Sequence, residues 1–448
     1  MPSPKSLMQS LKSNPCTTIK PSRLRLYGKG IQSIVTPQIM NETPSASRVH
    51  IGFFGRRNVG KSSIVNAVTG QDLSIVSEVP GTTTDPVFKA MELLPMGPVM
   101  LIDTPGIDDT GELGTLRVRK SKQVINKSDI ALLIVDATIG KTEAEQELLE
   151  MFRVKNIPYI VVYNKSDLLT NNTNREHKPA EAKEIYVSAT TKFQIAELKE
   201  LIAAMQPADT SLPLVRDLIE PFDFVVLVVP IDKAAPKGRL ILPQQQAIRD
   251  ILEAQAVAVM VKETELRETL THFGRKPKLV ITDSQVFDKV SADVPDSVFL
   301  TSFSILFARH KGVLLPAVKG AKALERLAVG DTILISEGCT HHRQCEDIGT
   351  VKLPRWISTY VGGKHVRFAF TSGREFPDDL SPYQLVVHCG GCMLNEREMK
   401  YRVQCALDQN IPVTNYGILI AYINGILKRS TAMFPEVAVE LEAGVSTK

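Results

Sequence analysis

The segment that most constrains this chain is rich in glycine and reads Gly55-Arg56-Arg57-Asn58-Val59-Gly60-Lys61-Ser62. An apolar run at 49–54 precedes it, and a helix-like stretch at 61–68 follows it. Its spacing is that of a P-loop, in which glycines let backbone N–H groups approach phosphate oxygens at a helix N-terminus. Because the loop requires this strand-to-helix context, the segment predicts an α/β sheet that binds a nucleotide at the carboxyl ends of its strands.

Further residues complete the predicted phosphate and magnesium chemistry. Asp103 and Gly106 come from Asp103-Thr104-Pro105-Gly106, which follows a second apolar run. The carboxylate suits the outer shell of magnesium, and the glycine N–H suits the γ-phosphate. Between the two motifs, we expect Thr83 to close over the metal, with Thr82 and Thr84 as alternatives. The predicted catalytic residues are Lys61, Thr83, Asp103 and Gly106, and the phosphate-binding residues are Gly55, Asn58, Val59, Gly60, Lys61, Ser62 and Ser63, of which Ser62 and Thr83 hold magnesium.

The base is predicted to be guanine. Asn164-Lys165-Ser166-Asp167 follows an apolar run at 159–163, and a carboxylate at Asp167 accepts two hydrogen bonds that guanine donates and adenine does not. Asn126-Lys127-Ser128-Asp129 spells the same four letters, but it precedes a strand instead of following one. We therefore assign this first copy a structural role. Ser188-Ala189, after another apolar run, completes the guanine pocket through backbone contacts.

Strand-like and helix-like stretches alternate along the whole chain, which predicts parallel α/β sheets. We expect three domains after a basic, disordered leader at 1–47. A P-loop domain spans 48–210, a small α/β domain spans 215–310, and a parallel α/β domain spans 314–436. In the middle domain the short sheet leaves edge strands open, which favours pairing with a second copy.

Cysteine and histidine residues gather in the last third of the chain. Cys339-Thr340-His341 is followed, after 46 residues, by His388-Cys389-Gly390-Gly391-Cys392. Both groups follow apolar runs, so both are expected at one edge of a parallel sheet. Three thiolates with a non-cysteine fourth ligand suit a 4Fe–4S cluster, and two or three Cys with one or two His also suit zinc. The spacing alone leaves both open; the ligand candidates are Cys339, Cys389 and Cys392, with His341 or His388 as a possible fourth, and Cys16, Cys345 and Cys405 receive no role.

The order of the nucleotide motifs resembles the TrmE–Era class of small GTPases. Ile107 follows Gly106, so the glutamine that positions water in Ras-like enzymes is missing. Asn58 occupies the place where potassium-activated members of that class carry an asparagine ligand. The resemblance implies slow GTP hydrolysis that potassium stimulates, with Asn58 binding K⁺; the alternative is that Asn58 is an ordinary loop residue.

Cys-x-His and His-Cys-x-x-Cys on a chain headed by such a GTPase domain resemble the maturation GTPase of FeFe-hydrogenase, the HydF family. The resemblance covers the chain from Met40 onward and implies a scaffold that holds a 4Fe–4S cluster through Cys339, Cys389 and Cys392. It implies that the three expected domains are, in order, a GTPase domain, a dimerisation domain and an iron–sulfur cluster-binding domain. It also implies a di-iron precursor as cargo, two radical-SAM maturases that load it, apo FeFe-hydrogenase as the recipient, and a homodimer or larger assembly. The implied cofactors are GTP, Mg²⁺, K⁺ and the cluster.

Charge and hydropathy bear on the remaining alternatives. The first 39 residues carry six Lys or Arg and no acidic residue, and the rest of the chain is slightly acidic despite the formal net charge of +4. No nucleic-acid partner is expected, which weakens the alternative of a zinc-stabilised TrmE–Era GTPase in RNA modification or ribosome assembly. Apolar runs are too short to span a bilayer. We expect a cytoplasmic protein, or an organellar one if residues 1–39 are a transit peptide.

Overall fold

The structure, a computed structural model, describes residues 45–70, 86–107, 121, 123–169, 184–205, 212–231, 240–338, 347–373 and 376–443. Residues 1–44 of the predicted leader, the switch residue Thr83 with its alternatives Thr82 and Thr84, and the candidate ligands Cys339 and His341 lie outside the described residues. The last three residues of the predicted disordered leader, Ser45–Ser47, instead form a short 3-10 helix.

The first sheet has six strands in the order β2-β3-β1-β4-β5-β6. Every neighbouring pair is parallel except β2 and β3, which run antiparallel. The sequence prediction of a parallel α/β sheet is confirmed, but it omitted β2. Only a three-residue turn separates β2 from β3, and such a short connection permits only antiparallel pairing. The strands are β1 (Val49–Phe54), β2 (Val87–Leu93), β3 (Gly97–Asp103), β4 (Ile130–Asp136), β5 (Tyr159–Asn164) and β6 (Glu184–Tyr186).

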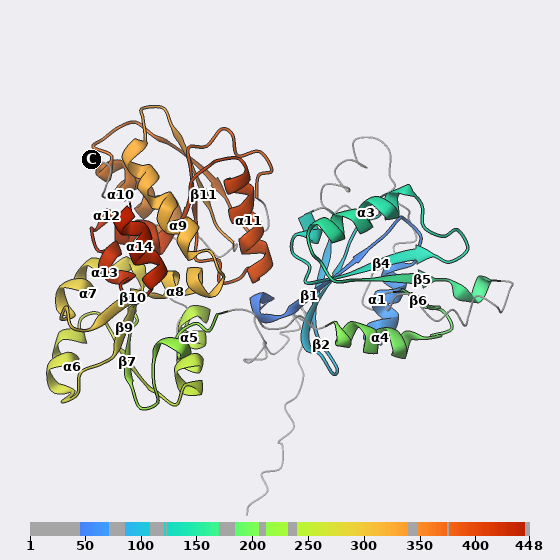
Figure 1. Ribbon diagram of the computed structural model, residues 1–448, viewed down its shortest axis with the longest axis horizontal. Helices are drawn as coiled ribbons and strands as arrows, with labels where there is room; N and C mark the ends of the chain where they lie inside the picture. The colour runs from blue at the N-terminus through green and yellow to red at the C-terminus, as the bar shows by residue number, and fades with distance from the viewer. Residues whose placement is uncertain are drawn as a thin grey trace, which may run out of the picture. The chain divides into compact units, whose positions relative to one another are not determined.

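Helices cover both faces of the first sheet (Figure 1). Helices α1 (Lys61–Thr69) and α4 (Ile195–Ala204) pack on one face, and α3 (Glu143–Val154) packs on the other. Alternate side chains of β1 divide between the two apolar cores, since Phe53 belongs to the first and Phe54 to the second. A sheet that is buried on both faces explains why its strands read as continuous apolar runs in the sequence.

The second sheet has four parallel strands in the order β10-β9-β7-β8. Its strands are β7 (Phe224–Val228), β8 (Val257–Val261), β9 (Leu279–Thr282) and β10 (Phe299–Ser302), and its helices are α5 (Leu242–Glu253), α6 (Leu266–His272), α7 (Phe287–Asp293) and α8 (Phe303–His310). Strand β8 lies at an edge of the sheet and exposes Val257 and Met260.

The third sheet is also fully parallel, in the order β12-β11-β13-β14. Its strands are β11 (Thr332–Ser336), β12 (Arg367–Thr371), β13 (Leu385–His388) and β14 (Val413–Asn415). Its helices are α9 (Leu314–Ala321), α10 (Leu353–Tyr360), α11 (Glu396–Asp408), α12 (Tyr416–Ile423), α13 (Leu427–Ser430) and α14 (Pro435–Ala443), and one π-helical turn, Ile348–Lys352, leads into α10.

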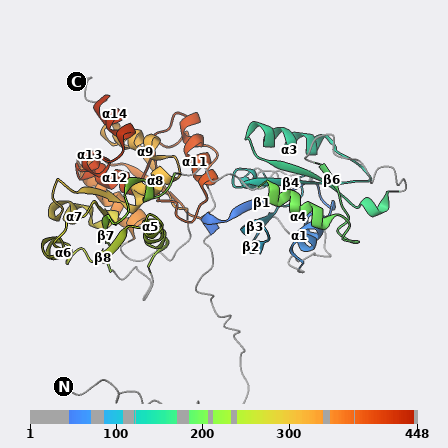
Figure 2. The ribbon, with the colours of Figure 1, turned by 60° about the horizontal axis from the view of Figure 1, so that its bottom comes forward.

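The second and third sheets share a single apolar core. Helix α8 packs against α9 and α12, and both ribbon views place these three helices together (Figures 1 and 2). Leu306 of α8 and Ile418 of α12 are both fully buried in that core. Because the core is continuous, a side chain of the second unit can reach a site in the third without crossing solvent.

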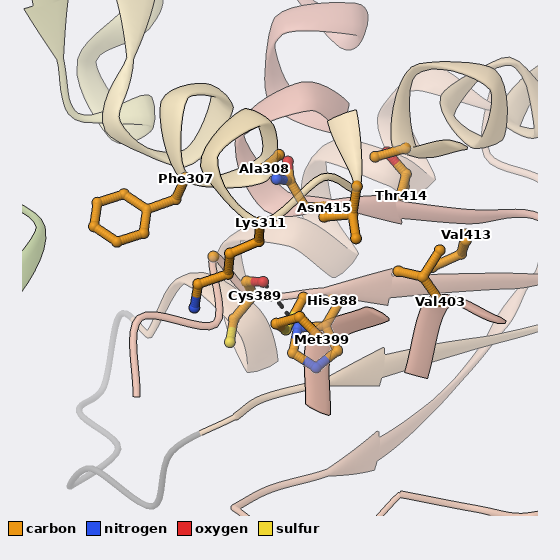
Figure 3. Close-up of a pocket in the computed structure, with 13 residues that line it drawn as sticks. Phe307, Ala308, Lys311, His388, Cys389, Met399, Val403, Val413, Thr414 and Asn415 are labelled. Carbon is orange, nitrogen blue, oxygen red and sulfur yellow. Dashed lines mark hydrogen bonds between the residues drawn. The ribbon is translucent and has the colours of Figure 1, made fainter. Parts of the chain in front are cut away.

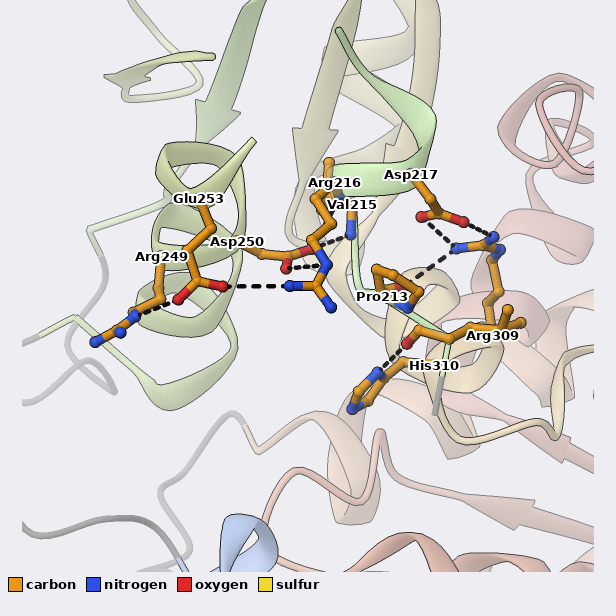
Figure 4. Close-up of polar contacts among 10 residues, drawn as sticks. Pro213, Val215, Arg216, Asp217, Arg249, Asp250, Glu253, Arg309 and His310 are labelled. Atoms are coloured by element: carbon orange, nitrogen blue, oxygen red, sulfur yellow. Dashed lines mark hydrogen bonds and ion pairs between the residues drawn. The ribbon is translucent and has the colours of Figure 1, made fainter. Parts of the chain in front are cut away.

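Polar contacts fasten the segment that leads into the second sheet (Figure 4). Asp250 of α5 accepts the N–H groups of Val215, at 2.6 Å, and of Arg216, at 2.8 Å. Arg309 of α8 donates to the Pro213 carbonyl at 3.1 Å and pairs with the carboxylate of Asp217. These contacts give the backbone groups of an irregular segment their hydrogen-bond partners.

None of the helices in the described part of the chain is long and apolar enough to cross a membrane.

Candidate functional site

The P-loop connects β1 to α1, as its sequence predicts. Gly60 precedes the helix with φ of 89°, a left-handed conformation that favours glycine. A Cβ atom at Gly60 would lie 2.3 Å from Nδ2 of Asn164, so a side chain here would collide with the guanine motif. At Gly106 a Cβ would lie 2.8 Å from the Arg57 backbone nitrogen. The P-loop therefore packs closely against the Asn164 side chain on one side and against the turn at Gly106 on the other.

Ser62, a predicted magnesium ligand, bonds Asp103, which is predicted to act in the outer shell of the metal. The Ser62 hydroxyl donates to Oδ2 of Asp103 at 2.6 Å, which brings the end of β3 to the first turn of α1. Oδ1 of Asp103 is buried and has no hydrogen-bond partner among the described residues. Burial raises the pKa of Asp103, and the Ser62 hydroxyl and the Lys61 ammonium partly offset that effect. A buried carboxylate oxygen beside a hydroxyl is an arrangement that a hard cation would satisfy.

Lys61 folds back onto its own loop. Its ammonium donates to the carbonyl of Gly55 at 3.0 Å and to that of Arg56 at 2.7 Å. Both acceptors are neutral, so an incoming phosphate would offer the ammonium a stronger, charge-assisted partner. Of the other predicted residues, Val59 is buried, and Asn58 and Ser63 are exposed. Asn58 has φ of 61°, which asparagine tolerates better than most residues.

Asn164 joins the guanine motif to the P-loop. Its Nδ2 donates to the Val59 carbonyl at 2.9 Å, and its Oδ1 accepts the Ala189 N–H at 3.1 Å. This one side chain brings three predicted segments together, namely the P-loop, the motif after β5 and the Ser188-Ala189 turn. Asp167 is exposed, so its carboxylate is accessible to a base.

Two residues that the sequence analysis missed support these motifs. Asp136, the last residue of β4, accepts the Lys165 ammonium at 2.7 Å. Burial alone would raise the pKa of Asp136, but Lys165 and Thr138 outweigh it and the pKa is lowered. In addition, Glu145 in α3 is fully buried and pairs with Arg56 of the P-loop at 2.6 Å. The position of Asp136 at a strand end, at the same sheet edge as the other motifs, was the signal available in the sequence.

The repeated motif, Asn126-Lys127-Ser128-Asp129, makes hydrogen bonds to β1 and to Val124. Asp129 accepts the His50 N–H at 2.8 Å, and its own N–H donates to the His50 carbonyl at 2.8 Å. The Ser128 hydroxyl donates to the Val124 carbonyl at 2.8 Å. These bonds join the segment to the start of β1, at the sheet edge opposite the P-loop, which agrees with a structural role.

The loop that carries Cys389 and Cys392, called the cysteine loop below, lies at the carboxyl ends of the strands of the third sheet, as the sequence predicts. Strands β11 and β13 are neighbours, and Ser336 is in register with His388. The Cys389 N–H donates to the Ser336 carbonyl at 2.9 Å. Gly338, which directly precedes Cys339, donates its N–H to Sγ of Cys389 at 3.0 Å. The chain therefore enters the Cys339 segment in contact with Cys389.

The environment of the Cys389 sulfur suits an anionic sulfur site. Sγ of Cys389 accepts a second N–H from Gly391 at 3.3 Å, and N–H donors of this kind stabilise thiolates and tune iron–sulfur clusters. Gly391 has φ of 62°, and a Cβ there would lie 2.4 Å from the sulfur of Met399. Burial raises the pKa of the Cys392 thiol, as does Cys389, whereas Lys311 lowers it. Donor set and backbone therefore fit a cluster bound through these thiols.

His388 has partners for both ring nitrogens. Arg402, which can only donate, lies 3.1 Å from Nε2, so Nε2 is the acceptor and the proton is on Nδ1. Nδ1 donates to the Cys389 carbonyl at 2.8 Å. Arg402 is itself 1% exposed and is bonded to Glu398 and to the Gly373 carbonyl. As placed, the ring has no nitrogen left for a metal, which disfavours His388 as a fourth ligand.

A small pocket opens beside the cysteine loop (Figure 3). Its lining includes His388, Cys389, Gly390, Met399 and Lys311. Lys311 follows α8 and is 4% exposed. Burial lowers its pKa to about 8, against the opposing effect of Cys392 and Cys389. No sequence pattern indicated Lys311, because only the packing of α8 against α9 and α12 brings it to this loop.

No group of three or more His, Cys, Asp or Glu side chains is placed to hold a metal ion within the described residues, a set that excludes Cys339 and His341.

Fold and first site together define a P-loop GTPase domain joined to two further α/β units. Residues 50–165 match the family described as 50S ribosome-binding GTPase. Residues 214–312 match the hydrogen maturase F dimerization domain, and residues 316–433 match the hydrogen maturase F tetramerization domain. The chain belongs to the hydrogen maturase F family, in agreement with the resemblance seen in the sequence.

Curated GTPases match part of this chain. GTPase Der of Kosmotoga olearia is 33% identical over 186 residues, which is 38% of this chain and 42% of that protein. The tRNA modification GTPase MnmE of Nitrosospira multiformis is 35% identical over 159 residues, 35% of each chain. The chain thus spans less than half the length of these relatives. Among solved structures, Aquifex aeolicus Era bound to GDP·AlF4⁻ is 23% identical, with a TM-score of 0.32, and the match covers 50% of this chain and 98% of that one.

Proposed function

We propose that this chain is a GTP-binding and GTP-hydrolysing scaffold of FeFe-hydrogenase maturation. In this proposal it holds a 4Fe–4S cluster, receives a di-iron precursor, and delivers that precursor to apo-hydrogenase. Membership of the hydrogen maturase F family supports the maturation role. The observation that carries the cluster is the pair of N–H bonds to Sγ of Cys389, one of them from the residue before Cys339.

GTP binding follows from the residues at the first sheet. Lys61 and the loop N–H groups would hold the phosphates, and Asp167 would select guanine. Ser62 and Thr83 would hold magnesium, with Asp103 in its outer shell. Magnesium would neutralise phosphate charge when bound. Ile107 packs against the apolar core and has no polar group with which to orient water. Slow hydrolysis with help from K⁺ at Asn58 is therefore part of the proposal.

The cluster ligands in this proposal are Cys339, Cys389 and Cys392. When bound, a 4Fe–4S cluster supplies a one-electron redox centre. The protein's own contribution is to fix the Cys389 sulfur with two backbone donors and to keep one side of the loop buried. His341 is the remaining histidine candidate for the fourth position, because both nitrogens of His388 are already bonded.

Assembly and partners complete the proposal. The dimerization and tetramerization family domains support a homo-oligomer. We propose that it works in the cytoplasm with two radical-SAM maturases that load the precursor, and that it binds neither membrane nor nucleic acid.

The deciding experiment is anaerobic reconstitution with iron and sulfide, followed by an activation assay. Brown protein with the EPR signal of a reduced 4Fe–4S cluster is expected. After coexpression with the two maturases, the protein should activate apo-hydrogenase. Colourless protein that holds one zinc per chain would contradict the cluster and favour the zinc-stabilised GTPase.

A further inference from the structure

Lys311 directly follows α8. Among the described contacts, its ammonium reaches the cysteine loop. It donates to the Leu394 carbonyl at 2.7 Å and to the Gly391 carbonyl. Both acceptors lie in the loop that carries Cys389 and Cys392. Its ring neighbour is Phe307, whose centroid lies 5.8 Å from Nζ. A buried ammonium is costly unless it is paired, so its retention here calls for a compensating negative group.

Gly391 links the lysine to the thiol. Its carbonyl accepts from Lys311, and its N–H donates to Sγ of Cys389 at 3.3 Å. The lysine therefore orients the same residue that hydrogen-bonds the sulfur. The ionisable groups that act on Lys311 are the Cys392 and Cys389 thiols and the Glu396 carboxyl. Glu396 pairs with Lys400, and no ion pair joins it to Lys311 among the described residues, so the two thiols are the ionisable groups of the loop left to act on Lys311.

Three thiolates on a 4Fe–4S cluster give a net negative charge, which becomes more negative when the cluster gains an electron. We propose, resting on the cluster of the proposed function, that Lys311 is a positioning residue of that site. It holds the loop between Cys389 and Cys392, and its ammonium form supplies a positive charge that favours the reduced cluster. The cluster site is then composite, because Lys311 lies in the region that matches the dimerization domain and the loop lies in the tetramerization domain.

The test is the midpoint potential of the reconstituted cluster, measured by EPR-monitored redox titration. Lys311→Met keeps the length of the side chain and removes the charge. Reduction should become less favourable on the order of tenfold, a shift of about 59 mV to more negative potential. Lys364→Met is the matched control. The Lys364 ammonium donates to the Leu327 carbonyl at 2.8 Å. Leu327 precedes β11, so this contact lies at the amino ends of the strands, away from the cysteine loop.

Lys311→Arg keeps the charge and should hold the potential near that of the wild type with full iron content. An unchanged potential in Lys311→Met at equal iron content would overturn the proposal. Circular dichroism shows whether Lys311→Met folds. If it does not fold, the test is made with Lys311→Arg. The proposal would then be contradicted if the midpoint potential of Lys311→Arg differs from that of the wild type by more than the potential of Lys364→Met does. Wild-type protein without any cluster would instead refute the proposed function.

Discussion

Arg402 donates to Nε2 of His388 across 3.1 Å in an interior where both side chains are almost fully buried. Since arginine has no acceptor, this contact fixes the histidine as neutral with its proton on Nδ1. The histidine that the motif placed among the ligands is thus part of the support for the loop. It orients the Cys389 carbonyl, while the cysteine sulfur points to other donors.

His388→Gln should therefore keep the cluster. Glutamine can still accept from Arg402, so the loss is confined to part of the hydrogen-bond network, about 1–3 kcal/mol of unfolding free energy. Iron and sulfide content after reconstitution and the thermal midpoint are the measurements. Cys389→Ser is the reference for a lost ligand. Iron content that drops to the level of Cys389→Ser would mean that His388 binds iron after all.

The duplicated motif offers a matched pair of variants in the GTPase domain. Asp167→Asn replaces a double acceptor by one donor and one acceptor, so GTP affinity should fall on the order of 100-fold. Xanthosine triphosphate, which presents an acceptor where guanine presents an amine, should bind better to this variant. Asp129→Asn preserves an acceptor for the His50 N–H and should leave GTP affinity within about threefold. Calorimetric titration measures both, and equal losses would contradict the assignment of Asp167.

Ser62→Ala removes the hydroxyl that bonds Asp103. Magnesium-dependent GTP affinity should fall on the order of tenfold, because a cation ligand and its orienting hydrogen bond are lost together. The measurement is GTP affinity with magnesium and with chelator. Wild-type affinity should drop when the metal is chelated, and the variant should show little further change. A variant with the full magnesium effect would exclude Ser62 as a ligand.

Asn58→Gly tests potassium. Glycine adopts the same left-handed backbone conformation, so the change removes only the side-chain amide. Wild-type GTP turnover should be faster in potassium than in sodium, and the variant should lose that difference while GTP affinity stays the same. Equal wild-type rates in the two salts would remove the potassium hypothesis altogether.

Met260→Lys tests assembly through the edge of the second sheet. Met260 is 41% exposed on β8, and a charge on an edge strand opposes pairing with another strand. Light scattering after gel filtration should show a smaller assembly. Val329→Lys, at a position 72% exposed in a loop, is the control and should not change the mass. An unchanged mass for Met260→Lys would place the interface elsewhere.

The local sequence determined much of this protein. Alternating apolar and amphipathic stretches specify parallel sheets, because strands buried on both faces must be apolar throughout. The glycines at 55 and 60 and the motifs after β3 and β5 specify a nucleotide site, because their chemistry depends on short-range spacing. The positions of Cys339 and Cys389 at the ends of two strands were enough to expect one shared edge.

Only the tertiary structure decided which side chains meet there. β2 depends on pairing with β3, and its half-exposed residues carry no strong pattern. His388 received its role from Arg402, fourteen residues away in sequence but adjacent in space. Lys311 reaches Gly391 across 80 residues only because α8 packs into the core shared by the second and third sheets. Such contacts arise from the packing of whole elements, and no local period records them.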